Sequence, residues 1–346
     1  MKILIDCRLA STSTRGMARY CREIVKSLIS LDKNNDVYLV ISKDTNDFGV
    51  LPENFHFIKT RSENYILSEQ IDLPRIVRKV KPDILWCTSN TFPIFLRKKT
   101  KLFVTIHDLI FMDKLPGKLS IYKKIGALYR KFVVKIFSYK IYEYFTVSEY
   151  SKVQIEKRLG ITDKGIVTSN CLSSDFASIA AKYITEQKEN YYFTVSGDGP
   201  SKNLSFLIKA FSNELKNEKL FVAGLSANSE YRTIKSNNII FMDVNLSDDA
   251  IIEKYCKCKA FIFPSLEEGF GLPIIEALCC KAKVIASNRS CIPEVVGDNG
   301  KLFNPENVNS LVDVINNLET DVYKYNYSKY DGWIKTAEIV YNEFNK

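Results

Sequence analysis

The segment PSLEEGFGLPIIEALCC, residues 264–280, places a glycine-rich loop between an expected strand and an expected helix. Gly269 and Gly271 permit backbone conformations that bring amide groups close to a ligand. Proline suits the first turn of a helix, so we expect the helix to begin near Pro273. Because a helix N-terminus attracts anions, the loop and the helix together form a candidate phosphate site.

Two carboxylates accompany this candidate site. Glu268 stands before the loop, and Glu276 lies in the first turns of the expected helix. Carboxylates accept hydrogen bonds from paired sugar hydroxyls, so the two residues could contact a hexose and a ribose on either side of a diphosphate. The alternative is structural: Glu276 would complement the helix dipole, and Glu268 would be exposed to solvent.

Three other segments hold residues that could belong to a binding site. Lys202 precedes an amphipathic helix, and it is either a cation for phosphate or a surface lysine. His107 and Asp108 follow an expected strand, at the end of a parallel sheet where ligands bind. A single histidine is nevertheless more often structural. Gly16 could let the backbone approach a ligand, or it could serve an ordinary turn.

Strands that alternate with helices are expected to position these segments. One series runs from KILIDC to EYSKVQIEKRL, and a second begins at Tyr191 with YYFTVSG and continues to KVIAS. Such alternation predicts βαβ units and a parallel sheet in each of two α/β domains. We expect a first domain at 1–171, a hinge at 172–190, a second domain at 191–323, and a C-terminal helix at 324–346 that could cross back to the first domain.

The composition argues against several other classes of protein. The nine cysteines are scattered, and the chain has only two histidines, so we expect reduced thiols and no metal site. No GxGxxG motif follows an expected strand, which argues against a dinucleotide-dependent enzyme. The N-terminus has the pattern of a buried strand and not of a signal peptide, and no stretch reaches the roughly 18 apolar residues of a spanning helix. We expect a cytoplasmic protein.

The positive charge of the chain is concentrated in its first half. Residues 1–170 hold 30 Lys and Arg against 17 Asp and Glu, whereas residues 171–346 hold 19 against 23. This asymmetry indicates that the first half meets a polyanionic surface. Residues 118–142 alone contain seven basic residues and no acidic one.

Apolar residues in this basic segment have helical spacing, which is typical of a helix that lies on a membrane. A core helix with a solvated basic face fits the composition equally well. Nucleic acid is not expected as the partner, because no nucleic-acid-binding motif is present. The residues expected to contact an anionic membrane are Lys123, Lys124, Arg130, Lys131 and Lys135.

The chain resembles the retaining family-four glycosyltransferases of GT-B fold, in which two Rossmann-like domains face each other across a cleft. EGFGLPIIEAL is similar to the E-x7-E motif of that family, and the resemblance extends over nearly the whole chain. It implies that Glu268 contacts the donor sugar and that Glu276 binds the nucleotide ribose. It also implies that the amides of Gly269, Phe270 and Gly271 contact the sugar and the phosphates.

A second resemblance lies in VSGDGPSKNLSFLIKAF, which is similar to the family segment Gly-x3-Pro-Arg-Lys-Asn. It implies that Lys202 is the cation on the donor diphosphate. The chain departs from the pattern at Ser201, which stands at the usual arginine, and at Ser196, which stands at the usual glycine. Cys171 also replaces the usual glycine of an Asn-Gly pair.

The first domain carries the remaining family segments. TRGMARYCREIV is similar to the glycine loop and following helix, which implies that Gly16 lies near the reaction centre. VTIHDLIF matches the family's His-Asp motif, which implies that His107 faces the donor sugar and that Asp108 supports it. FTVSEYSK is similar to the TVSxxS segment, in which we expect Ser148 to cap a helix.

The resemblance implies a retaining sugar transfer without metal or cofactor, with His107, Glu268 and Lys202 as the candidate catalytic residues. The donor would be a nucleotide sugar bound mainly by the second domain, and the first domain would bind the acceptor. The acceptor would be a lipid-linked saccharide or an oligosaccharide at the cytoplasmic face of the membrane, in the synthesis of O-antigen or capsule. Two alternatives remain: a nucleotide-sugar epimerase of the same fold, and a degenerate subunit that binds without transfer.

Overall fold

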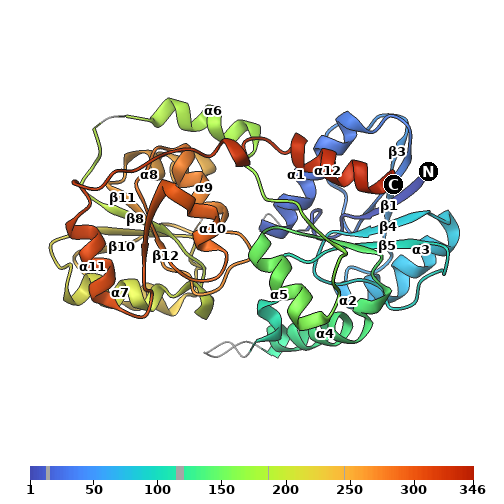
Figure 1. The fold of residues 1–346 in the computed structure, drawn as a ribbon, viewed down its shortest axis with the longest axis horizontal. Coiled ribbons are helices and arrows are strands. Elements are labelled where there is room, and N and C mark those ends of the chain that lie inside the picture. Colours follow the sequence, from blue (N-terminus) through green and yellow to red (C-terminus); the bar gives the residue numbers. More distant parts are fainter. Residues whose placement is uncertain (13–15, 114–120, 186, 245) are drawn as a thin grey trace. The chain divides into compact units, whose positions relative to one another are not determined.

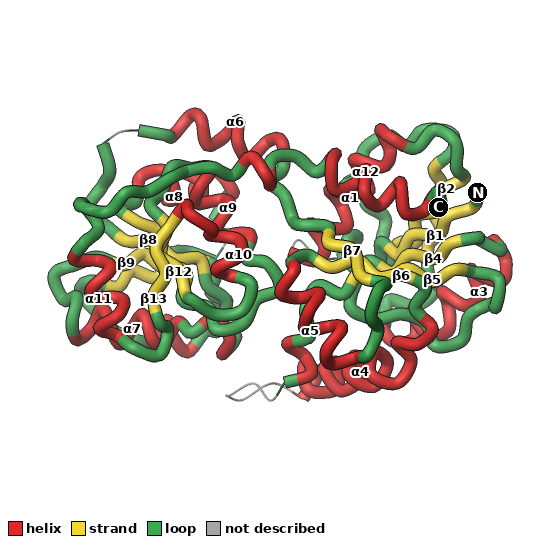
Figure 2. The backbone as a smooth tube through the Cα atoms, in the orientation of Figure 1, coloured by secondary structure: helices red, strands yellow, loops and turns green. Residues whose placement is uncertain are grey.

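The computed structural model describes residues 1–12, 16–113, 121–185, 187–244 and 246–346. Contacts divide the chain into two compact units. The first unit contains the described residues of 1–170 and of 333–346, and the second contains those of 171–332. In each unit helices surround a parallel sheet (Figures 1 and 2), so the expected fold of two Rossmann-like domains is confirmed.

The sheet of the first unit has the order β3-β2-β1-β4-β5-β6-β7 over the described residues, and all neighbouring strands are parallel. Its strands are β1 Lys2–Asp6, β2 Asp36–Ile41, β3 Phe55–Lys59, β4 Ile84–Cys87, β5 Lys101–Thr105, β6 Glu143–Thr146 and β7 Gly165–Val167. Its helices are α1 Gly16–Leu31, α2 Tyr65–Leu67, α3 Leu73–Val80, α4 Ile121–Phe137, α5 Glu149–Leu159 and α12 Ile334–Phe344. Strand β4 is buried along its whole length, as expected for a parallel sheet that is covered on both faces.

The sheet of the second unit is also parallel, in the order β10-β9-β8-β11-β12-β13 within the part of the chain that the structure describes. Its strands are β8 Tyr192–Val195, β9 Leu220–Ala223, β10 Ile239–Phe241, β11 Ala260–Phe263, β12 Val284–Ser287 and β13 Gly300–Phe303. Its helices are α6 Ser174–Tyr183, α7 Leu204–Asn213, α8 Asp248–Lys257, α9 Leu272–Cys279, α10 Ile292–Val296 and α11 Val308–Asn316.

In each sheet the side on which the chain adds its next strand changes once. In the first unit the chain builds outward from β1 to β2 and β3, and it returns to add β4 on the other side of β1. In the second unit β8 and β11 stand in the same relation. The loops that leave two such strands diverge, and the crevice between them is where open α/β sheets bind ligands. We call these two places the first and the second switch point.

The C-terminal helix is shorter than expected. It begins at Ile334, whereas residues 324–332 form a chain segment with one 3₁₀ turn at Ser328–Tyr330. This segment holds Asn326, Ser328, Asp331 and Gly332, residue types that favour turns, and Gly332 has a φ of 79°. Helix α12 packs against α1 within the first unit (Figure 1).

The expected hinge at 172–190 contains the helix α6, which packs against α8 of the second unit. The bending of the chain at this segment and the separate roles of the two domains stay predictions. Among the described residues, no helix combines the length and the apolar character needed to cross a membrane.

Candidate active site

The loops after β8 and β11 are joined at the second switch point. The backbone N–H of Leu266 donates to the carbonyl oxygen of Ser201 over 2.7 Å. Asn203 has a φ of 53°, and its side-chain amide donates to the carbonyl oxygens of Pro264 at 3.3 Å and of Pro305 at 3.0 Å. Asparagine tolerates this left-handed conformation better than most residues, so Asn203 holds three loops in one arrangement.

Two of the three candidate catalytic residues meet across these loops. Lys202 Nζ lies 2.6 Å from Glu268 Oε1. The Lys202 side chain is 34% exposed, whereas that of Glu268 is 11% exposed. A diphosphate bound by the ammonium group would therefore lie beside a fixed carboxylate that can accept sugar hydroxyls.

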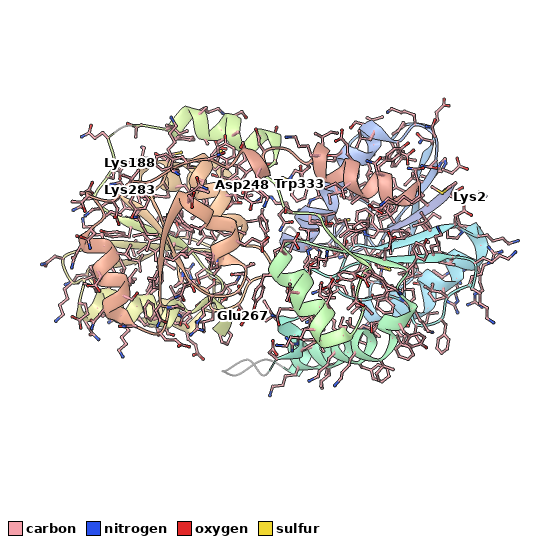
Figure 3. The ribbon with its side chains drawn as sticks, viewed as in Figure 1. Lys2, Lys188, Asp248, Glu267, Lys283 and Trp333 are labelled. Carbon is pink, nitrogen blue, oxygen red and sulfur yellow. The ribbon has the colours of Figure 1, made fainter. Side chains whose placement is uncertain are left out.

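The glycine-rich loop is fixed from its other side by the residues that precede α10. Ser290 Oγ accepts the backbone N–H of Glu268 at 3.1 Å. The thiol of Cys291 lies 3.2 Å from the carbonyl oxygens of both Glu268 and Phe270. Phe270 is buried and packs edge to face on Tyr330, with ring centroids 5.3 Å apart. The loop, which Figure 3 marks at Glu267, is thus held before any ligand binds.

Helix α9 begins at Leu272, directly after this loop, and Pro273 occupies its first turn as expected. Gly271 has a φ of 100°, and an added Cβ would lie 3.0 Å from Ile274 Cδ1, so the turn into the helix requires glycine here. Gly269 is not among the glycines with positive φ. The conformational freedom expected of both glycines is therefore used only at Gly271.

Glu276 lies on the buried side of α9. Its side chain is 9% exposed, and its Oε2 accepts a hydrogen bond from the hydroxyl of Tyr255 at 3.1 Å. Burial raises the pKa of Tyr255, so this tyrosine stays a hydrogen-bond donor at neutral pH. The hydrogen bond from Tyr255 thus fixes the orientation of one carboxylate oxygen of Glu276. The binding of a ribose by Glu276 stays a prediction.

His107 follows β5 in the first unit, where the sequence places it. Its side chain is 5% exposed, and its ring packs on Tyr20 with a centroid distance of 4.8 Å. Nε2 lies 3.0 Å from the carbonyl oxygen of Thr88. A carbonyl only accepts hydrogen bonds, so Nε2 carries the proton and Nδ1 keeps its lone pair. Burial lowers the pKa of His107 to about 4, so the imidazole is neutral at pH 7.

The other expected residues of the first unit have different surroundings. Gly16 is the exposed first residue of α1, and an added Cβ would meet no described atom within 4 Å. Asp108 accepts the backbone N–H of Ile110 at 3.0 Å, which is a local turn contact. Ser148 caps α5 by accepting the backbone N–H of Ser151 at 3.1 Å, so the expected cap is confirmed.

A network of buried charges underlies the first switch point. Arg8, which is 1% exposed, binds both carboxylate oxygens of Asp6 at 2.8 Å. The Arg8 nitrogen Nη2, which binds Asp6, also approaches Glu69 Oε2 at 3.4 Å. Glu69 is fully buried and accepts hydrogen bonds from Thr91 at 2.7 Å and from the hydroxyl of Tyr129. Burial raises the pKa of Glu69, which these partners oppose.

Helix α4 covers residues 121–137 of the basic segment, whose first residues, 118–120, lie outside the described part of the chain. The helix exposes apolar side chains beside its lysines. Ile125, Leu128, Phe132 and Ile136 are 50–66% exposed, at positions that form one stripe along the helix. Val133 and Val134 face the core of the unit. We call the four exposed residues the apolar stripe of α4.

The basic residues of α4 form an adjacent row. Lys124, Lys131 and Lys135 are exposed, and Arg130 is half-buried. The side chain of Lys123 lies outside the described residues. A helix that only covered a core would bury its large apolar side chains, whereas α4 keeps its apolar stripe exposed.

Sequence reasoning missed several residues that organise these places. Asn203, Ser290 and Cys291 fix the loops of the second unit, and Asn90 receives the backbone N–H of His107 at 2.7 Å. The available signal for Asn90 was its place in the polar run that follows the buried strand β4. The charges of Asp6 and Arg8 at the end of an apolar strand were the signal for the buried network.

Two family models together match nearly the whole chain. The model described as Glycosyltransferase Family 4 matches residues 14–175, and the model described as Glycosyl transferases group 1 matches residues 175–338. The chain therefore belongs to the family-4, group-1 glycosyltransferases, and the expected family is confirmed.

Curated relatives include enzymes named for mannosyl transfer. The chain is 24% identical to the serotype-specific mannosyltransferase WbdA of Escherichia coli, over 93% of this chain and 44% of that protein. It is 23% identical to the O-antigen chain mannosyltransferase RfbU of Salmonella typhimurium, over 74% of this chain and 70% of that protein. The chain spans less than half the length of WbdA.

Solved structures share the fold of the chain. The superposition on sucrose-phosphate synthase from Thermosynechococcus elongatus has a TM-score of 0.73 at 14% identity, and it covers 100% of this chain and 98% of the synthase chain. The superposition on the lipopolysaccharide outer core galactosyltransferase WaaB has a TM-score of 0.68 at 16% identity, and it covers 100% of this chain and 99% of the WaaB chain. These likenesses establish the GT-B fold, with its two Rossmann-like domains.

Proposed function

We propose that this chain transfers a sugar, with retention of configuration and without a metal, from a nucleotide-sugar donor to a saccharide acceptor at the cytoplasmic face of a membrane. The observation that carries the proposal is the second switch point. A lysine, a carboxylate and a glycine loop that opens a helix meet there, in a family of glycosyltransferases.

The donor would bind in the second unit. Lys202 would contact the diphosphate, together with the amide groups at the start of α9, because both offer positive charge to phosphate oxygens. Glu268 precedes this helix start and Glu276 lies within α9, and a hydrogen bond orients the carboxylate of each residue. The carboxylates would accept hydroxyls of the sugar and of the ribose.

The transfer breaks the bond between the anomeric carbon and the diphosphate oxygen, and the nucleoside diphosphate leaves with the electron pair. A bond forms between the same carbon and an acceptor hydroxyl oxygen, and the hydroxyl proton passes to the departing phosphate or to water. Lys202 and the helix amides would stabilise the charge that develops on the leaving group, which lowers the barrier.

His107 would act as a hydrogen-bond partner and not as an acid at neutral pH. Its pKa of about 4 leaves the ring uncharged, and its Nε2 proton is held by Thr88. The Nδ1 lone pair could accept a hydroxyl of the donor sugar, which fits the role that the family resemblance implies.

Contact with a membrane surface would be made through α4. The apolar stripe would enter the interface, and the neighbouring lysines would meet anionic head groups at about 1 kcal/mol for each charge. The names of the relatives support a role in O-antigen or related polysaccharide synthesis, with mannose as the first sugar to test.

The first experiment is a calorimetric and thermal-shift screen of the full chain against GDP-, UDP-, dTDP- and ADP-sugars, mannosyl donors among them. We expect one nucleotide class to bind and stabilise the protein, and Lys202→Ala to weaken that binding about tenfold or more. Lys209→Ala on the exposed side of α7 is the matched control, since it removes the same charge from the same unit.

The outcomes separate the three functions. Release of nucleoside diphosphate that depends on an acceptor indicates transfer, and conversion of the donor sugar alone indicates an epimerase. If no nucleotide sugar binds, the proposal of a transferase fails and a degenerate subunit takes its place. Activity that EDTA abolishes and added Mg²⁺ restores would refute the metal-free mechanism.

A further inference from the structure

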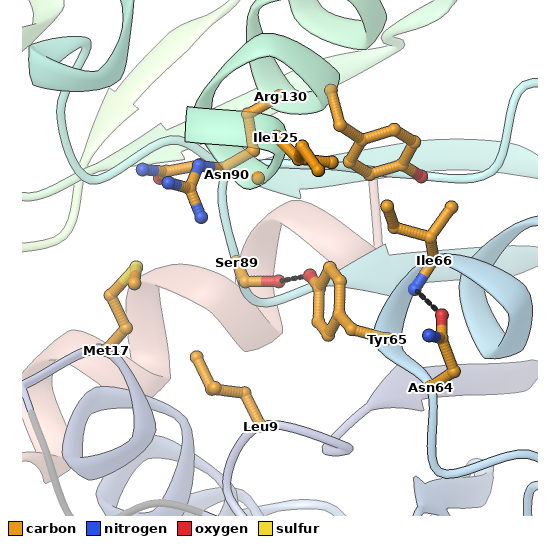
Figure 4. A pocket seen from close by; sticks show the side chains of 11 residues that line it. Leu9, Met17, Asn64, Tyr65, Ile66, Ser89, Asn90, Ile125 and Arg130 are labelled. Atoms are coloured by element: carbon orange, nitrogen blue, oxygen red, sulfur yellow. Dashed lines mark hydrogen bonds between the residues drawn. The ribbon is translucent and has the colours of Figure 1, made fainter. Parts of the chain in front are cut away.

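Tyrosine hydroxyls of this chain have different partners. In the first unit Tyr65 lines a cavity of about 240 Å³ at the first switch point, and its hydroxyl lies 2.8 Å from Ser89 Oγ (Figure 4). In the second unit the buried hydroxyl of Tyr192 has no hydrogen-bond partner among the described residues. The hydroxyl of Tyr255 donates to Oε2 of Glu276 at 3.1 Å. The hydrogen bond of Tyr255 therefore connects the core of the second unit with a candidate donor-binding residue.

The ring of Tyr255 is held between two strands. Tyr255 belongs to α8 and is fully buried. Its ring centroid lies 5.0 Å from that of Phe193 in β8, with the ring planes at 82°, and 5.0 Å from that of Phe261 in β11. These are the two strands of the second switch point. Aromatic packing on both strands fixes the ring, so the position of its hydroxyl is fixed as well.

The carboxylate of Glu276 depends on such a donor for its orientation. The torsion that turns the carboxylate plane of a glutamate has a broad energy profile, so the side chain alone does not define the plane. The Tyr255 hydroxyl donates to this carboxylate from a fixed position. Burial raises the pKa of Tyr255, and the neighbouring carboxylate raises it further, so the hydroxyl keeps its proton at neutral pH.

A carboxylate with a fixed plane suits a pair of adjacent hydroxyls. Its two oxygens offer about four acceptor positions, so one carboxylate can bind a tyrosine hydroxyl and ligand hydroxyls at the same time. The two hydroxyls of a ribose bind best when the carboxylate plane matches the plane of the diol. A site built for hydroxyls rejects a ligand that lacks them, because its buried polar groups then lose their partners.

We infer that Tyr255 is a positioning residue that gives the donor site its selection for a ribonucleotide. It orients the Glu276 carboxylate toward the two ribose hydroxyls, and a nucleotide without them loses this interaction. The inference rests on the proposed function, in which Glu276 accepts the ribose hydroxyls, and it narrows the donor to the ribonucleotide sugars. GDP-, UDP- and ADP-sugars belong to this class, whereas dTDP-sugars lack the 2′-hydroxyl.

The test compares ribonucleotides with nucleotides that lack both hydroxyls. GDP, UDP and ADP, and the 2′,3′-dideoxy form of each, are titrated calorimetrically into the full chain. For the base that binds most tightly, we expect the wild type to prefer the ribose form about tenfold to hundredfold. Tyr255→Phe should reduce this preference about fivefold or more and leave the affinity for the dideoxy form within about twofold. Tyr192→Phe removes a buried hydroxyl of the same unit, and as the matched control it should keep the wild-type preference.

A double-mutant cycle shows whether Tyr255 acts through Glu276. Glu276→Ala should abolish the preference for the ribose form, and the addition of Tyr255→Phe should have no further effect on it. A structural role alone would weaken the ribose and dideoxy forms equally in Tyr255→Phe, and that result overturns the inference. A further loss of preference caused by Tyr255→Phe in the Glu276→Ala background has the same meaning.

The outcomes separate this inference from the proposed function. If the wild type prefers the ribose form and Tyr255→Phe keeps the full preference, the proposed donor site is retained and the inference is wrong. If a dTDP-sugar binds most tightly in the donor screen, the transferase proposal is again retained and the inference fails. If no nucleotide binds, both fail.

Discussion

The two switch points share one topology and differ in where their charges lie. At the second switch point Lys202 and Glu268 form a partly exposed pair above loops that are held by Asn203. At the first switch point the pair of Arg8 and Asp6 is buried, and the accessible surface is a largely apolar cavity. The same fold thus has a partly exposed charged pair in the second unit and a buried charge network in the first.

This difference shows how chemistry is assigned on a repeated architecture. An accessible lysine beside a helix N-terminus suits a diphosphate, whereas a cavity with apolar walls and a few polar groups suits a ligand that carries apolar surface. The sheets supply only the divergence of loops, and the residues on those loops decide the ligand. The two places can therefore be tested independently, by substitutions that act on one and spare the other.

The largest expected effect comes from breaking the buried network. Glu69→Ala should lower the free energy of unfolding of the first unit by about 3–5 kcal/mol, because it leaves buried partners of the carboxylate without an acceptor. Guanidinium titrations followed by tryptophan fluorescence will report it, since Trp86 and Trp333 both lie in this unit.

An exposed ion pair of the same unit is the control for that effect. Lys59 and Asp44 lie 2.6 Å apart, but their side chains are 51% and 86% exposed. Asp44→Ala should therefore change the free energy of unfolding by less than about 1 kcal/mol. If Glu69→Ala costs no more than Asp44→Ala, the buried network does not stabilise the first unit and the contrast between the switch points loses its basis.

At the second switch point the corresponding loss should appear in activity and not in stability. Lys202→Ala removes the partly exposed cation, and we expect kcat/KM for transfer to fall about a hundredfold to a thousandfold. Release of nucleoside diphosphate in the presence of acceptor measures it, with Lys209→Ala as the control. A fall of less than threefold would mean that Lys202 does not stabilise the leaving group.

The second switch point was largely predictable from the sequence. Glu268, Gly271 and Pro273 lie close together along the chain, so their spacing alone indicates a loop that opens a helix. Lys202 is 66 residues from Glu268, so no local spacing predicts that the two side chains meet. In the sequence only the family resemblance placed both residues in one site. Asn203 was missed because its role depends on a left-handed backbone and on two carbonyl groups of distant loops.

The first switch point was less predictable, because its residues come from five separate segments. No local spacing connects Leu9, Tyr65, Asn90 and Arg130, which the sheet order brings around one cavity. The basic character of α4 was evident in the sequence, but composition could not decide whether its apolar residues face the core. Packing decides this: Val133 is buried, while Leu128 is 66% exposed.

The membrane interpretation predicts a further difference between the two units. Replacing Lys124, Lys131 and Lys135 together by Gln should weaken binding to anionic vesicles by about 3 kcal/mol, roughly a hundredfold. Co-sedimentation with vesicles of anionic and of zwitterionic lipid measures it. Leu128→Ser in the apolar stripe should weaken binding to both kinds of vesicle.

Three lysines of the second unit serve as the matched control. Lys209, Lys216 and Lys219 are exposed, so their triple change to Gln alters the net charge by the same amount. It should leave vesicle binding nearly unchanged if the contact is made through α4. Equal losses in the two triple variants would show a general charge effect and would contradict a specific membrane face.

The smallest expected effect concerns His107, whose backbone N–H donates to Asn90 in the wall of the cavity of the first unit. Its native pKa of about 4 lies below the ordinary value of 6.5, so the unfolded chain takes up a proton between these values while the native chain does not. The free energy of unfolding should therefore fall as pH decreases, by about 2 kcal/mol between pH 6.5 and pH 5.

A substitution isolates this contribution. His107→Gln should flatten the pH dependence of the free energy of unfolding by about 2 kcal/mol. If the variant retains the wild-type slope, His107 titrates alike in the folded and unfolded chains. A neutral imidazole fixed by Thr88 would then be the wrong description, and its role as a hydrogen-bond acceptor for the donor sugar would lose its physical basis.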